Sequence, residues 1–165
     1  MKKFLIIGNI NAVAYKEIFP LIKENKMWLG VRPATGGMWF IVDDETSCGT
    51  KKIVDNKLLG NTNSIWFTNL DHTKRNEPIN LYKHYNPEEY PKYDNYDAIN
   101  VDKTCEIPMG YYGIMGVPIT FIDKYCPEQF EIIGYACNGS NNQFDYCKPI
   151  INGKNIYKRL LIKRR

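Results

Sequence analysis

Histidine is scarce in this sequence of 165 residues, and its cysteines do not occur in closely spaced pairs. The two histidines, His72 and His84, stand beside scattered carboxylates, a spacing that does not match a zinc site. The five cysteines form no CxxC pair, and their odd number argues against a disulfide framework. Because no signal peptide is recognisable, we expect reduced thiols and a cytoplasmic location. The spacing of the histidines and carboxylates leads us to expect no bound metal.

Long apolar runs are also missing. The longest lie near Phe4–Ile7 and Gly113–Ile122, well short of the roughly 20 residues of a membrane helix. We therefore expect no membrane association. The hydrophobic share of 44% and the charged share of 24% are typical of an ordered globular protein. The length suits one domain and is short for two, so we expect a single domain over residues 1–165.

Tyrosine and clustered positive charge are what the sequence does contain. It has 12 Tyr beside 7 Phe and 3 Trp. Tyrosine suits wet binding surfaces as well as cores, although AT-rich codons would produce the same bias. The net charge of +4 permits polyanion binding without requiring it. From Lys154 the tail reads KNIYKRLLIKRR, with six basic residues and no acidic one. Such a cluster favours phosphates through counterion release. The alternative is a terminal strand whose charges are merely solvated.

The N-terminal third alternates between apolar strand and helix patterns. The continuous apolar run Phe4–Ile7 predicts a strand buried on both faces, as inside a parallel sheet. Helical spacing over Tyr15–Asn25 predicts a short helix, with a kink at Pro20. Strands are expected at Met27–Val31 and Met38–Val42. Strand followed by helix is half of a β-α-β unit, so the predicted fold class is α/β.

The remainder has strands separated by polar segments. Asp43–Thr62 has no clear pattern, and Lys57–Gly60 is expected to form a turn. Asp71–Asp97 is charged and interrupted by prolines, so we expect an irregular surface excursion of the kind that often carries binding. Further strands are expected at Ser64–Leu70, Val117–Ile122, Phe130–Tyr135 and Ile156–Ile162.

Several segments resemble the EcoRI-type adenine-specific DNA methyltransferase family. They are FLIIGNINAVAYKEIFPLIKENKMWLG, WFTNLDH, YPKYDNYDAINVDK, GIMGVPITFIDKYCPEQFEIIG and GKNIYKRLLIKRR. One small departure is Cys126, where the family often has Asn before Pro-Glu-Gln-Phe. The resemblance implies an incomplete methyltransferase-type (Rossmann-like) mixed sheet with a flanking helix and an irregular recognition excursion. It places late sheet strands and a helix in 1–42, target recognition in 43–112, and closing strands with the basic tail in 113–165.

The same resemblance implies that two functional loops of the family are missing from this sequence. Family members hold S-adenosylmethionine with a glycine-rich loop and grip the flipped adenine with an Asn/Asp-Pro-Pro-Tyr/Phe loop. Both lie upstream of the strand that here begins at Phe4. The resemblance therefore implies the C-terminal part of a DNA adenine-N6 methyltransferase of a restriction-modification system. We expect no catalytic residue in this chain, no donor binding by it alone, and activity only with the N-terminal half. Whether that half is a separate chain, was lost by a frameshift or was left out stays open.

Two segments superficially resemble the base-gripping loop. Residues 86–90 read Asn-Pro-Glu-Glu-Tyr, with one extra residue and two carboxylates that would repel DNA. Residues 126–130 lack the amide at the first position. The glycines at 36–37 and in 110–116 do not join a good strand to a helix, so we expect turns there rather than a cofactor loop. None of these segments is predicted to be catalytic.

Double-stranded DNA is the predicted partner. Basic and aromatic groups on the excursion are expected to neutralise phosphates and support a displaced base, and asparagines to read adenine edges. These asparagines could instead cap their own turns. The predicted contacts are Asn69, Lys74, Arg75, Asn76, Lys92, Tyr93, Lys158, Arg159, Lys163, Arg164 and Arg165.

Two other hypotheses remain beside the methyltransferase part: a non-catalytic DNA- or protein-binding module, and an unrelated enzyme with its own pocket. A chain that starts at a central strand is expected to leave apolar surface without its normal partner. We therefore expect a homodimer or a soluble aggregate.

Overall fold

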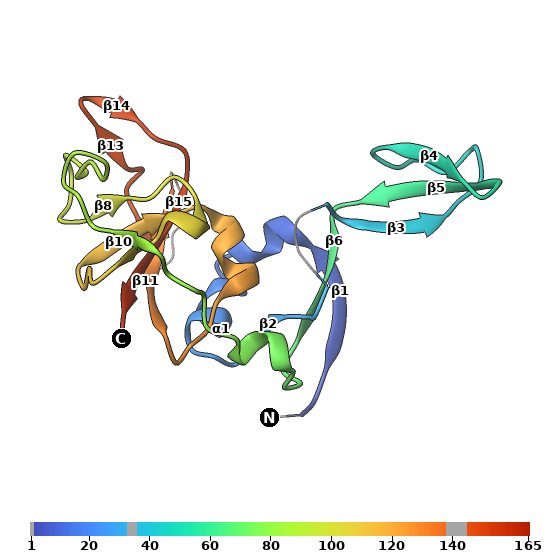
Figure 1. Cartoon of the computed structure of the whole chain (residues 1–165). Coiled ribbons are helices and arrows are strands. Elements are labelled where there is room, and N and C mark those ends of the chain that lie inside the picture. Colours follow the sequence, from blue (N-terminus) through green and yellow to red (C-terminus); the bar gives the residue numbers. More distant parts are fainter. Residues whose placement is uncertain (1, 33–35, 138–144) are drawn as a thin grey trace.

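The computed structural model describes residues 2–32, 36–137 and 145–165. Its body contains a three-stranded and a five-stranded sheet with short helices between them, and another three-stranded sheet projects from one side (Figure 1). The chain is therefore mixed α/β and mostly strand, as the α/β fold class predicted at the coarse level. Among the described residues, no helix is long and apolar enough to cross a bilayer.

The first sheet places the N-terminal strand at an edge. Its order is β1-β6-β2, with β1 (Leu5–Asn9) and β2 (Trp28–Leu29) both antiparallel to β6 (Ser64–Thr68). The strand predicted at Phe4–Ile7 is present, but the prediction of a doubly buried parallel strand is wrong. Side chains 5–7 of β1 are each at least 50% exposed. β6 is the only strand that pairs with β1 among the described residues, so the other edge is open.

The helix predicted over Tyr15–Asn25 is present but shorter, and a 3-10 helix that was not predicted precedes it. The 3-10 helix η1 spans Ile10–Ala14, and α1 spans Phe19–Lys23. Pro20 lies in the first turn of α1 and does not kink it. A first-turn position tolerates proline because its missing N–H would have no intrahelical partner there. Phe19 and Ile22 of α1 are buried.

The projecting sheet has the order β3-β5-β4, all antiparallel. Its strands are Met38–Ile41 (β3), Lys51–Val54 (β4) and Lys57–Thr62 (β5). The turn predicted at Lys57–Gly60 is wrong, because those residues belong to β5. The reversal falls instead at Asp55 and Asn56, whose φ angles are 49° and 57°. Asp and Asn tolerate this left-handed region better than most residues, which suits them to a two-residue hairpin turn.

The five-stranded sheet carries most of the C-terminal half. Its order is β12-β11-β15-β10-β8, with antiparallel pairing in the middle and parallel pairing at both outer strands. The strands are Asp145–Tyr146 (β12), Phe130–Ala136 (β11), Arg159–Arg164 (β15), Ile114–Val117 (β10) and Ile99–Asn100 (β8). The strand predicted at Val117–Ile122 is wrong: Pro118 follows β10 and opens the 3-10 helix η4, Ile119–Lys124.

The predicted irregular excursion, Asp71–Asp97, is confirmed as largely irregular. It contains only a 3-10 helix, η2, and the two-residue strand β7, which pairs with β9. Two further short strands, β13 and β14, pair with each other before the C-terminal strand. The bounds of the remaining elements are Thr73–Asn76 (η2), Lys83–His84 (β7), Thr104–Glu106 (η3), Pro108–Met109 (β9), Ile150–Ile151 (β13) and Lys154–Asn155 (β14).

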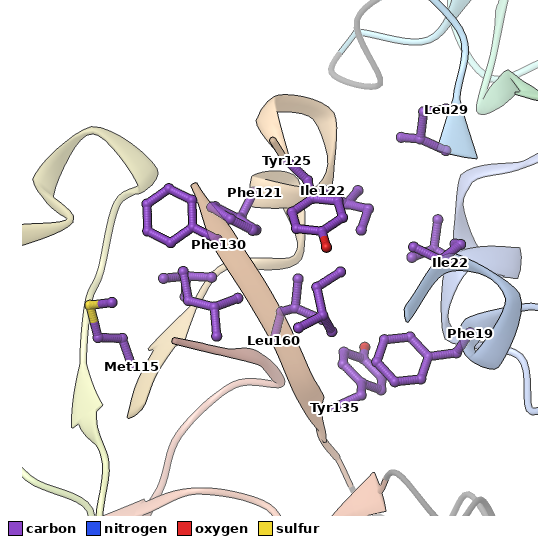
Figure 2. Close-up of a cluster of buried hydrophobic side chains, with 14 of the residues drawn as sticks. Phe19, Ile22, Leu29, Met115, Phe121, Ile122, Tyr125, Phe130, Tyr135 and Leu160 are labelled. Carbon is purple, nitrogen blue, oxygen red and sulfur yellow. The ribbon is translucent and has the colours of Figure 1, made fainter. Parts of the chain in front are cut away.

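Aromatic side chains connect the two halves of the core (Figure 2). Phe19 of α1 packs against Tyr135 of β11, with ring centroids 5.9 Å apart. Phe121 of η4 meets Phe130 of β11 edge to face at 5.4 Å, a favoured aromatic geometry. The same cluster includes Ile65 and residues from both body sheets. The three-stranded and five-stranded sheets therefore share one core.

The central strand β15 provides a direct test of this core. Ile162 is completely buried, and we expect Ile162→Ala to lower the free energy of unfolding by about 2–5 kcal/mol, because the lost methyl groups leave a cavity. The matched control is Ile53→Ala on the projecting sheet, where the side chain is 73% exposed. It should change stability by no more than about 0.5 kcal/mol. Urea unfolding of both variants measures the difference, and equal losses would contradict the assignment of the core.

Candidate nucleic-acid interface

Tyr93 and Arg159, two of the predicted DNA contacts, lie in the interior. Tyr93 is 5% exposed and Arg159 is 8% exposed. The Tyr93 hydroxyl donates to Asn100 Oδ1 at 2.9 Å, and Arg159 Nε donates to the same oxygen at 3.1 Å. Arg159 Nη2 also lies 3.3 Å from Asp102 Oδ1. Burial raises the pKa of the Tyr93 phenol, so it remains a proton donor at neutral pH. Arg159 thus connects β15 to β8, and Tyr93 connects the excursion to β8. Neither the ring nor the guanidinium is presented to solvent.

Lys158 and Arg159 have different surroundings, because Lys158 precedes β15 and Arg159 is its first residue. Neighbouring side chains on a strand point to opposite sides, so the five predicted basic contacts in residues 158–165 cannot all face one way. Lys158 is exposed, whereas Arg159 is buried. Lys163 and Arg165 are exposed as well, and Arg164 is half-buried with its guanidinium 5.3 Å from the ring centre of Tyr112.

Lys74 and Arg75 are engaged within the protein. Lys74 Nζ lies 2.8 Å from Asp123 Oδ1, and both side chains are mostly buried. The Arg75 guanidinium stacks 3.7 Å from the ring centre of Trp28 and donates to Asn25 at 3.2 Å. Such a stacked, hydrogen-bonded arginine packs η2 against the neighbouring sheet. Contact with a phosphate would have to compete with these interactions.

The two asparagines predicted to read bases have different surroundings. Asn69 Oδ1 accepts from the backbone N–H of Phe4 at 2.9 Å, and its Nδ2 donates to the carbonyl of Lys2 at 2.8 Å. Asn69 therefore binds the chain just before β1 with both ends of its amide. Asn76 is exposed and makes only a long 3.4 Å contact with Asp71. Of the two, Asn76 has the amide that is accessible to a ligand.

Lys92 is exposed beside Asp97. The two charges are 3.5 Å apart, with side chains 66% and 93% exposed. Ion pairs at such exposure contribute little to stability. Lys92 is therefore accessible, but the nearby carboxylate offsets its charge.

One group of predicted contacts does come together, at the carboxyl end of β15. Asn76, Arg164 and Arg165 line a surface depression of about 300 Å³ together with Cys126 and Gln129. The end of the chain is fixed there because the backbone N–H of Arg165 donates to the Gln129 carbonyl at 3.0 Å. Glu128 also lines this depression and partly offsets its positive charge. We call Lys163, Arg164 and Arg165 the terminal basic cluster.

The other end of β15 carries residues that sequence reasoning missed. Lys158 lines a cleft of about 400 Å³ together with Asn11, Tyr15, Tyr135 and Tyr157. The tyrosine next to Lys158 in the basic tail was a signal available in the sequence. Tyr15 lies in the range that was predicted to be helical, but it precedes α1 and is 54% exposed.

Neither segment that resembled a base-gripping loop offers a free ring. Tyr90 is 4% exposed and donates its hydroxyl to the Glu106 carbonyl at 2.7 Å. Asn86 Oδ1 accepts from the backbone N–H of Glu88 at 3.1 Å, so it caps its own turn. Phe130 is completely buried in the core. Both rings are therefore used in packing within the protein.

The described residues also lack a cradle for a methyl donor. Within 2–32, 36–137 and 145–165, no glycine-rich segment connects a strand directly to a helix. Gly36 and Gly37 lie between β2 and β3 with φ angles of 91° and 64°, as expected of a turn. The residues present therefore do not fit S-adenosylmethionine, and we derive no chemical step that involves it.

Comparison with known proteins identifies the family. The family model described as "Adenine-specific methyltransferase EcoRI" matches residues 1–165. The chain belongs to this EcoRI adenine-specific methyltransferase family. The resemblance predicted from the sequence segments is therefore confirmed over the whole chain. No solved structure gives a significant match.

The relatives in this family are longer than the chain. It is 48% identical to Type II methyltransferase M.EcoRI of Escherichia coli over 170 residues, covering 99% of this chain and 51% of the relative. It is 35% identical to M.MpnI of Mycoplasma pneumoniae, covering 99% of this chain and 57% of the relative. The same identity and coverage hold for M.MgeORF184P of Mycoplasma genitalium. The chain thus spans about half the length of the curated relatives it matches.

Proposed function

We propose that the chain is the C-terminal, target-recognition-containing part of a DNA adenine-N6 methyltransferase of a restriction-modification system. In this proposal it supports methyl transfer from S-adenosylmethionine only together with an N-terminal half. The proposal rests on the share of each protein that is matched. The family model matches the whole chain, while the chain covers only 51% of M.EcoRI. The absence of a donor cradle among the described residues is consistent with this division of labour.

The first sheet supports a place for the other half. β1 has an open edge, and Leu5, Ile6 and Ile7 are 54%, 52% and 50% exposed. An open edge with apolar side chains is a template for another strand. We propose that the sheet β1-β6-β2 is the end of a larger methyltransferase-type sheet, which continues beyond β1 with a strand from the N-terminal half. Its antiparallel pairs would make that sheet mixed, as the family resemblance implies.

For DNA contact we propose both ends of β15. Lys158 lies at one end and the terminal basic cluster at the other, about 20 Å apart at roughly 3.3 Å per residue. Lys158, Lys163 and Arg165 are exposed, as is Asn76, which lines the same depression as Arg164 and Arg165. Phosphates would be neutralised along this line, and Asn76 would read a base edge.

The projecting sheet favours a second candidate, a non-catalytic protein-binding module. Phe40 of β3 is 43% exposed and Ile53 of β4 is 73% exposed, and the strand register places both on one face of the sheet. Apolar side chains gathered on an exposed sheet often mark a surface for a protein partner. The two candidates are distinguished by methyl transfer after addition of an N-terminal half, which only the first predicts.

DNA binding is tested by its dependence on salt. If about three basic side chains contact phosphates, log affinity should fall with log salt at a slope of roughly −2.7, from about −0.9 per phosphate. Replacing Lys163, Arg164 and Arg165 with alanine should flatten this slope and weaken all duplex sequences alike, because phosphate contacts carry little sequence information. Fluorescence anisotropy with labelled duplexes at several salt concentrations measures both effects.

A matched control removes three lysines from the projecting sheet, Lys51, Lys52 and Lys57, and should leave the slope unchanged. If the terminal triple variant also keeps its slope, the tail is only a solvated end. The DNA surface would then have to lie on the Asp71–Asp97 excursion.

A further inference from the structure

A cleft of about 400 Å³ lies where the carboxyl ends of β1 and β11 approach the residues that precede β15. η1 and Tyr15 form one wall, and Tyr135, Tyr157 and Lys158 contribute the other. Its volume falls in the range of about 300–1,000 Å³ that is usual for small-ligand sites. It is far too small for a duplex.

The exposed groups around this cleft are unusual for a solvent-facing surface. Tyr15 is 54% exposed and Tyr157 is 72% exposed, so two aromatic rings are accessible at one site. Within the part of the chain that the structure describes, the Asn11 side-chain amide makes no hydrogen bond, since only its backbone N–H is bonded, to Asn9. The Lys158 ammonium has no ion-pair partner within the same residues.

Each of these groups corresponds to one part of a nucleotide. Aromatic rings stack on the face of any base, and this stacking tolerates all sequences. An asparagine amide can both donate to and accept from a base edge, most favourably that of adenine. A lysine ammonium neutralises a phosphate. A base that is still paired within a duplex cannot offer its face, so the ligand must be unpaired or displaced.

We propose that this cleft binds one unpaired nucleotide of the DNA. Its base stacks on Tyr157 and Tyr15, its base edge bonds to Asn11, and its phosphate contacts Lys158. The inference deepens the proposed function and rests on it, because it takes DNA as the ligand. It adds a site for an extrahelical base at the junction of the two body sheets.

The test uses the full 165-residue chain and two duplexes of identical length and sequence context. One is fully paired, and the other carries 2-aminopurine opposite an abasic position. We expect the second duplex to bind about tenfold more tightly, which lies within the range measured for base–aromatic stacking. The 2-aminopurine fluorescence should fall on binding because the base stacks. Tyr157→Ala should abolish both effects, whereas Tyr157→Phe keeps the stacking face and should retain them.

Tyr82→Ala is the matched control, because Tyr82 is 60% exposed and does not line the cleft. It should leave the preference for the unpaired base unchanged. Equal effects of Tyr82→Ala and Tyr157→Ala would overturn the proposal, provided that circular dichroism shows both variants folded. Displacement of the duplex by free deoxyadenosine monophosphate at equal concentration would also overturn it, since a free nucleotide would then be the ligand.

The failure of this inference can be told apart from the failure of the proposed function. If the paired duplex binds with a normal salt slope and the unpaired base adds nothing, the cleft is not a nucleotide site and the DNA-binding proposal stands. If neither duplex binds, both proposals are wrong.

Discussion

No methyl transfer above a heat-killed control is expected when the isolated chain is incubated with labelled S-adenosylmethionine and duplex DNA of mixed sequence. Transfer should appear when the half of M.EcoRI that precedes the matched region is added. The physical reason is that the described residues contain neither a donor cradle nor a free aromatic ring on a base-gripping loop. The relative is 48% identical over the shared region, which makes its other half a reasonable complement.

The control for reconstitution is the M.EcoRI half alone, which should be inactive because it lacks the target-recognition part. Adding the chain with its terminal basic cluster replaced by alanine should lower the restored activity at moderate salt. Transfer by the isolated chain would show that it contains a donor site of its own. Inactivity of the mixture, with both halves folded, would favour the protein-binding module.

The family was predictable because it depends on local residue identity over several long segments. The family model accordingly matches residues 1–165. Element positions were predictable where an apolar run had turn residues beside it, as at Phe130–Ala136. The environment of β1 was not predictable, because a continuous apolar run has the same sequence pattern whether or not strands cover it on both sides. Pro20 was misread because a proline that begins a helix and one that kinks it look alike in sequence.

The interface was harder to predict than the fold. Arg159 and Tyr93 look like DNA contacts by residue type, yet Asn100 between them provides a buried acceptor that only the fold brings close. Asn69 was assigned to a base edge, but its amide is used by the backbone of the segment before β1. Conversely, Asn11 and Tyr157 are 146 positions apart by their numbering and meet in one cleft. Long-range placement decided which polar groups remain accessible.

The open edge of β1 should make the isolated chain self-associate. Two copies can pair their β1 edges and bury Leu5, Ile6 and Ile7, which are at least half exposed in the monomer. Light scattering at high protein concentration should therefore show a dimer or a soluble aggregate. Ile6→Lys should weaken association at least about tenfold, because the variant loses the roughly 1.5–3 kcal/mol of burying an isoleucine and places like charges across the interface. Each 1.4 kcal/mol corresponds to about a factor of ten in the dissociation constant.

The control for this prediction is Ile53→Lys, which adds the same charge to a 73% exposed position on the projecting sheet. It should leave the association unchanged if β1 is the contact, and should disrupt the association if the projecting sheet is the contact.

The proposed role of the β1 edge also predicts how the chain behaves when an N-terminal half is added. Because the strand that continues the sheet would occupy the same edge, adding the N-terminal half of M.EcoRI should convert the homodimer into a one-to-one complex. Ile6→Lys should then weaken reconstituted methyl transfer as well. A wild-type chain that stays monomeric at high concentration would show that the β1 edge does not associate with itself. If Ile6→Lys reconstitutes as well as the wild type does, the other half binds elsewhere.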